Sequence, residues 1–155
     1  MRTDNSGRYV VGGFTENGGA ATRDILISRF LSDGSLDNSF AVSGLYTLDL
    51  TADRDEVNGL VVDSNRRIYG GGWKENGGGA TRDFYVIRLD SAGVLDTTWG
   101  VSGISTADYN GRRDELYKLA IASNGTETST LAVGHRPPTP IHGISRSCVS
   151  TRPVS

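Results

Sequence analysis

The sequence is poor in the residues from which many catalytic and metal sites are built. It contains one cysteine, two histidines and four prolines, so an internal disulfide framework is excluded. His135 and His142 stand in a proline-rich stretch with Cys148 beyond them, and this is not the spacing of metal ligands. We therefore expect no metal ion and no cofactor.

Long apolar runs and an excess of one charge are also lacking. No stretch approaches the ~20 apolar residues of a membrane helix, so we expect no membrane insertion. The 16 basic and 18 acidic residues are interspersed and leave a net charge of -2, which argues against a nucleic-acid partner. No apolar leader follows Met1, yet Asp4 aligns with Asp63 in the middle of the repeat described next. We expect the chain to be a fragment of a longer protein.

Glycine, by contrast, is abundant, with 21 residues. Segments rich in Val, Ile, Thr and Tyr separate the glycine-rich turns, a pattern typical of many short β-strands. The segment ENGGAATRD at 16–24 returns as ENGGGATRD at 75–83, which is 59 positions later. Tandem copies of one structural unit are therefore predicted.

The same offset aligns residues throughout the chain. It pairs Gly12-Gly13-Phe14 with Gly71-Gly72-Trp73, Arg29 with Arg88, Leu36-Asp37 with Leu95-Asp96, and Arg54-Asp55-Glu56 with Arg113-Asp114-Glu115. Strands are predicted at 8–14, 24–30, 44–50, 56–62, 67–73, 83–89 and 103–108. The segment ELYKLAIA at 115–122 has a helical composition, but its counterpart contains Gly59 and consecutive valines, so we expect a strand there too.

Four consecutive antiparallel strands per unit predict β-propeller blades, in an all-β, incomplete propeller of about two to three blades. The expected parts are a partial first blade with strands two to four (1–54), a complete second blade (55–113), the start of a third (114–134) and an irregular or disordered tail (135–155). Closure into a ring typically takes four to eight blades. Either further blades of the same protein or other copies of this chain would complete it.

The spaced pattern of Asp24, Arg29, Asp33-Gly34, Leu36-Asp37, Phe40 and Gly44, followed by Asp55-Glu56, Asn58 and Leu60, resembles the delta-60 repeat. This bacterial tandem repeat is found in large proteins that are generally extracellular or surface-associated. The resemblance covers about residues 4–134. It implies a β-propeller-like fold, an extracellular or cell-surface location and no established enzymatic activity.

Charged residues of two kinds of loop are expected to gather on one rim of the blades. The rim consists of Arg23, Asp24, Arg54, Asp55, Arg82, Asp83, Arg113 and Asp114, together with Asp53, Glu56, Arg112 and Glu115. Guanidinium groups and carboxylates suit polyhydroxylated or carboxylate ligands. The alternative, which the recurrence in each copy favours, is that these side chains serve the blades themselves.

No carboxylate pair is distinguished from the others, so no catalytic residue is assigned. We expect a non-enzymatic repeat module of a secreted or surface protein, structural or binding carbohydrate or another protein. The alternative is a fragment of a propeller enzyme, such as a glycosidase or lyase acting on carbohydrate.

Overall fold

The computed structural model describes residues 1–16, 22–77, 81–109, 111–123 and 128–133. Every regular element within these ranges is a β-strand, so the expected all-β fold is confirmed. Strands form because β-branched and aromatic residues alternate with smaller ones between glycine-rich turns. The tail predicted at 135–155 lies outside the described residues.

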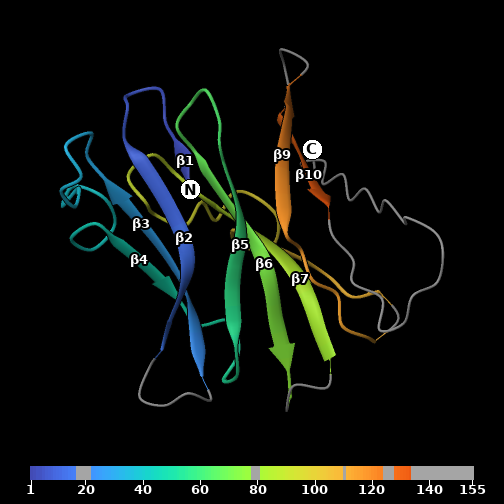
Figure 1. Ribbon diagram of the computed structural model, residues 1–155. Coiled ribbons are helices and arrows are strands. Elements are labelled where there is room, and N and C mark those ends of the chain that lie inside the picture. Colours follow the sequence, from blue (N-terminus) through green and yellow to red (C-terminus); the bar gives the residue numbers. More distant parts are fainter. Residues whose placement is uncertain (17–21, 78–80, 110, 124–127, 134–155) are drawn as a thin grey trace.

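Two four-stranded antiparallel sheets follow one another, and each keeps its strands in chain order (Figure 1). The first blade consists of β1 (Arg2–Thr3), β2 (Tyr9–Glu16), β3 (Arg23–Phe30) and β4 (Leu45–Leu48). The second blade consists of β5 (Asp55–Val62), β6 (Ile68–Asn76), β7 (Thr81–Leu89) and β8 (Ile104–Ala107). In a third unit, β9 (Lys118–Ser123) pairs antiparallel with β10 (Thr128–Val133).

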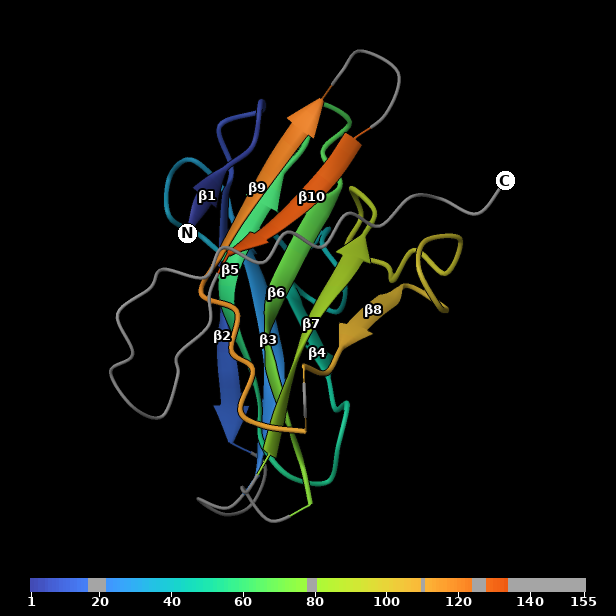
Figure 2. The same ribbon diagram turned by 90° about the vertical axis from the view of Figure 1, so that its right-hand side faces the viewer.

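The blades stack face to face and bury one apolar cluster in each interface. Figure 2 views this stack from the side of β9 and β10, with the second blade behind them and the first behind that. The first cluster joins Val10, Ile25 and Ile27 of the first blade to Leu60, Ile68 and Ile87 of the second. The second cluster joins Tyr69, Val86 and Trp99 to Leu116 and Leu119. Burying each such side chain contributes about 1.5–3 kcal/mol.

Three glycines in β6 allow this close stacking. A Cβ on Gly70 would lie 2.9 Å from Ile27 of the first blade, and one on Gly71 would lie 3.1 Å from Leu116 of the third unit. Neighbouring blades therefore approach β6 from both faces. The close main-chain approach that the glycine pair predicts is present.

The strands agree with the predicted ones, with ends that shift by a few residues. β9 begins at Lys118 rather than at Glu115, and the residues that would pair with its missing start lie beyond Val133, outside the described part of the chain. The prediction of only three strands in the first copy is wrong. Arg2–Thr3 pairs with β2, because Asp4 N donates to Arg8 O at 2.9 Å and folds the chain back.

Candidate functional site

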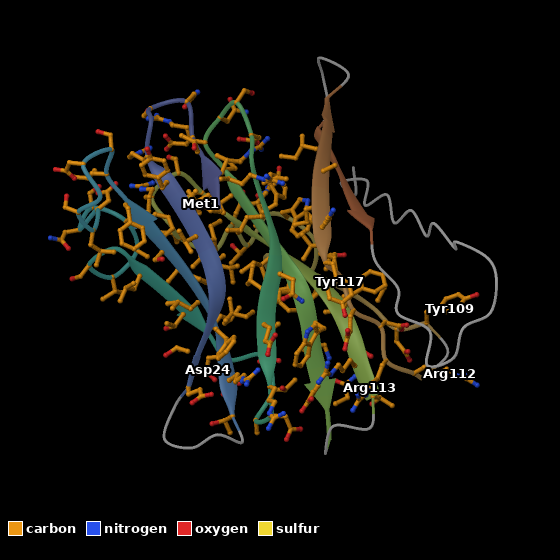
Figure 3. All side chains as sticks on the ribbon, viewed as in Figure 1. Met1, Asp24, Tyr109, Arg112, Arg113 and Tyr117 are labelled. Atoms are coloured by element: carbon orange, nitrogen blue, oxygen red, sulfur yellow. The ribbon has the colours of Figure 1, made fainter. Side chains whose placement is uncertain are left out.

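The loops that we expected to form a rim meet at one end of the stacked blades. At the start of each third strand an arginine bridges to the following interblade loop, Arg23 to Arg54 and Arg82 to Arg113. Figure 3 shows Asp24 of the first blade and Arg113 after the second at the same, lower end of the molecule. The predicted rim residues are thus brought to one end.

Arg82 links the second blade to the third unit. Its guanidinium carbon lies 3.6 Å from the centroid of the Trp73 ring, and its Nη2 lies 2.9 Å from Glu75 Oε1 in the same blade. Nη1 donates across the interface to Glu115, whose other carboxylate oxygen accepts a hydrogen bond from Tyr117 Oη. Burial acts to raise the pKa of Glu115, but these hydrogen bonds outweigh it and lower the pKa. The interblade pair is therefore ionised at neutral pH.

Arg23 makes the same contacts one blade earlier. Its guanidinium carbon lies 4.1 Å from the Phe14 ring centroid, its Nε lies 3.7 Å from Glu16 Oε1, and its Nη1 donates to Glu56 of the second blade. Each partner sits 59 residues before the corresponding partner of Arg82. We call this recurring arrangement of arginine, aromatic ring and two glutamates the rim clasp.

Asp55 holds the loop between the first and second blades. Its Oδ2 accepts hydrogen bonds from the main-chain amides of Leu50 (2.7 Å) and Thr51 (3.0 Å), and Thr51 Oγ1 donates to Oδ1 at 3.1 Å. Complete burial raises the pKa of Asp55 to about 6, although the hydrogen bonds act in the opposite direction. Asp114 plays the same part in the next loop, where it accepts from Tyr109 N.

The remaining predicted rim residues also make contacts within the protein. Asp83 lies 3.2 Å from Lys74 Nζ on the neighbouring strand; the loop amides expected to bind it, at 78–80, lie outside the described residues. Asp24 is buried and has an interaction partner. Arg54 accepts a hydrogen bond from Glu75 N at 2.8 Å through its carbonyl oxygen, and Arg113 is exposed but engaged.

A second arginine joins the blades at the β3–β4 turn. Arg29 Nε lies 2.8 Å from Asp37 Oδ2, and Arg29 Nη1 donates to Ser91 O of the second blade at 2.6 Å. Its guanidinium stands 4.5 Å from the centroid of Phe40, which is fully buried beside Gly93 of the second blade. The predicted roles of Arg29 in ion pairing and of Phe40 in packing between blades are both confirmed.

Sequence reasoning missed how the rim side chains are paired. It did not assign the stacking of Arg82 on Trp73 or the part that Glu75 plays beside them. A signal was available, because glutamate and arginine stand at the two ends of the repeated segment, Glu16 with Arg23 and Glu75 with Arg82. These ends face each other in the antiparallel register of each hairpin.

Other classes of site were searched in the described part of the chain. It contains no group of three or more His, Cys, Asp or Glu side chains arranged to hold a metal ion. Nor do the described residues include a helix long and apolar enough to cross a membrane.

Residues 5–40 and 64–98 match the family described as a domain of unknown function (DUF5122) β-propeller. These two repeats belong to that family. Each matched DUF5122 segment contains the second and third strands of a blade and the turn after them. The match confirms the resemblance to the delta-60 repeat and the propeller architecture. No curated protein matches the chain at a significant level.

Proposed function

We propose that the chain is a non-enzymatic propeller module of a secreted or surface bacterial protein, with a structural or ligand-binding role. The observation that carries this proposal is the rim clasp. Arg23 and Arg82 use their guanidinium groups on a ring and on carboxylates of their own and the next blade. Recurrence of these charges therefore serves blade stacking, and none of the recurring pairs is set apart for chemistry.

The outer face of the first blade supports further blades as partners. Ile68 and Tyr85 of the second blade are 1% and 0% exposed in the cluster against the first blade. The equivalent residues of the first blade, Tyr9 and Leu26, are only half-buried. Another blade, from the same protein or from a second copy, would cover them in the same way.

Light scattering tests the covering of this face. We expect association of the chain that increases with concentration and is weakened by Leu26→Asp. Val42→Asp is the matched control, because Val42 is exposed in a turn and away from that face. A chain that stays monomeric at every concentration would contradict a self-complementary face.

The delta-60 resemblance supports the secreted or surface location, and the charged rim supports carbohydrate or protein as partner. A glycan array combined with a hydrolase and lyase screen of the same chain tests the role. We expect saturable binding without release of cleaved product. Turnover of a bound glycan would instead establish the propeller enzyme.

A further inference from the structure

One rim loop departs from the repeat, and it does so at exposed positions. The rim clasp and the buried interblade aspartate recur in both copies because they serve the blades. Residues that replace their counterparts in only one loop are not explained by blade stacking. In the second interblade loop and the start of the third unit the replacements are Tyr109 for Leu50, Arg112 for Asp53 and Tyr117 for Asn58.

These replacements place aromatic rings and positive charge in solvent. Tyr109 is 64% exposed and Tyr117 is 43% exposed, whereas Leu50 packs partly against the first core cluster. Arg112 and its neighbour Arg113 are exposed as well. Figure 3 shows all four on one side of the lower half, with Tyr109 and Arg112 outermost. Exposed aromatic side chains in such a group mark interaction surfaces.

The main chain of this loop is used inside the protein. Gly111 N donates to Asp108 Oδ1 at 2.8 Å, and Arg112 O accepts from Arg82 N at 3.2 Å. Tyr109 N donates to Asp114. The loop therefore offers side chains to a ligand and has little main chain left to pair with an added peptide strand, which is how many extended peptides bind.

We propose that Tyr109, Arg112, Arg113 and Tyr117 form a binding surface for an acidic polysaccharide, a chain of uronic acid units. Guanidinium groups bind carboxylates through a planar pair of hydrogen bonds. Tyrosine rings offer an apolar face to the sugar ring and a hydroxyl to its polar rim. The inference specifies the ligand of the proposed binding module and rests on that proposed function.

Titration of the chain with polygalacturonate, followed by calorimetry, tests the surface. The double variant Tyr109→Leu with Arg112→Asp restores the residues of the first interblade loop and leaves the main-chain bonds in place. We expect its Kd to rise at least tenfold. Arg66→Asn is the control, since Arg66 is exposed in the β5–β6 turn at the opposite end and has a φ of 64° that asparagine tolerates. This control should keep the Kd within twofold.

Each further result decides for or against the surface. A neutral polysaccharide should bind at least tenfold more weakly, and so should polyglutamate. The proposal is overturned by absence of polygalacturonate binding, by unchanged binding of the double variant when its melting temperature is unchanged, or by equal binding of polyglutamate. New reducing ends or unsaturated products in the same mixtures would refute the non-enzymatic function while leaving the binding result intact.

Discussion

At the scale of the residue, two glycines at equivalent positions lie in opposite surroundings. A Cβ on Gly72 would lie 1.7 Å from Glu56 O and 2.8 Å from its carbonyl carbon. A Cβ on Gly13 would meet nothing within 4 Å, because β1 is too short to reach it. The repeat makes the two residues look equivalent, and the difference between them arises only from the neighbouring strand.

We predict that Gly72→Ala lowers the free energy of unfolding by about 2–4 kcal/mol, since a methyl group there displaces the main chain of β5. Gly13→Ala should change it by less than ~0.5 kcal/mol. Chemical denaturation of the two variants checks the contrast. Equal losses at both positions would show that the β5–β6 contact is not as close as described.

At the scale of the element, the loop from β4 to β5 is held by one buried carboxyl group. Asp55 has a folded-state pKa of about 6, above the ~3.9 of an unfolded chain. Folding therefore takes up a proton between these values. The stabilisation from this uptake is complete below pH ~4 and is lost as the pH rises through 6.

Asp55→Asn should remove this dependence, because asparagine does not titrate. Stability measured by denaturation from pH 4 to 7 should fall in the original protein by about 3 kcal/mol more than in the variant. Carboxyl groups with a lowered pKa, such as Asp37 and Asp96, lose their stabilisation on further acidification in both proteins, so they cancel in the comparison. Parallel pH curves would rule out a raised pKa for Asp55.

Most elements could be predicted from the repeat, including one that local composition opposes. The segment ELYKLAIA is not helical because Leu116 and Leu119 pack against Gly71 of the second blade, so tertiary contacts override propensity. β1 could not be predicted, since two residues carry no periodicity. The rim was predictable as a place, but stacking of Arg82 on Trp73 depends on side-chain conformation and blade spacing, which no sequence pattern encodes.

At the scale of the whole molecule, stacking of the blades is the central feature. Apolar clusters fill the middle of each interface, and arginines close it at both ends, through the rim clasp and through Arg29 at the β3–β4 turn. Outside the second interblade loop, the charged rim is therefore mainly the joint between blades. A chain built in this way can be extended by further blades on its outer face, as proposed above.

The ion pair of Arg82 and Glu115 provides the most direct test of this account. The two side chains are only 16% and 11% exposed, so their coupling should exceed that of a surface pair. A double-mutant cycle with Arg82→Met, Glu115→Gln and both changes, measured by denaturation, should give a coupling of about 1–3 kcal/mol. Arg82→Met combined with Asp33→Asn, in an exposed turn of the first blade, should be additive. A coupling below ~0.5 kcal/mol for Arg82 and Glu115 would contradict the claim that the rim charges hold neighbouring blades together.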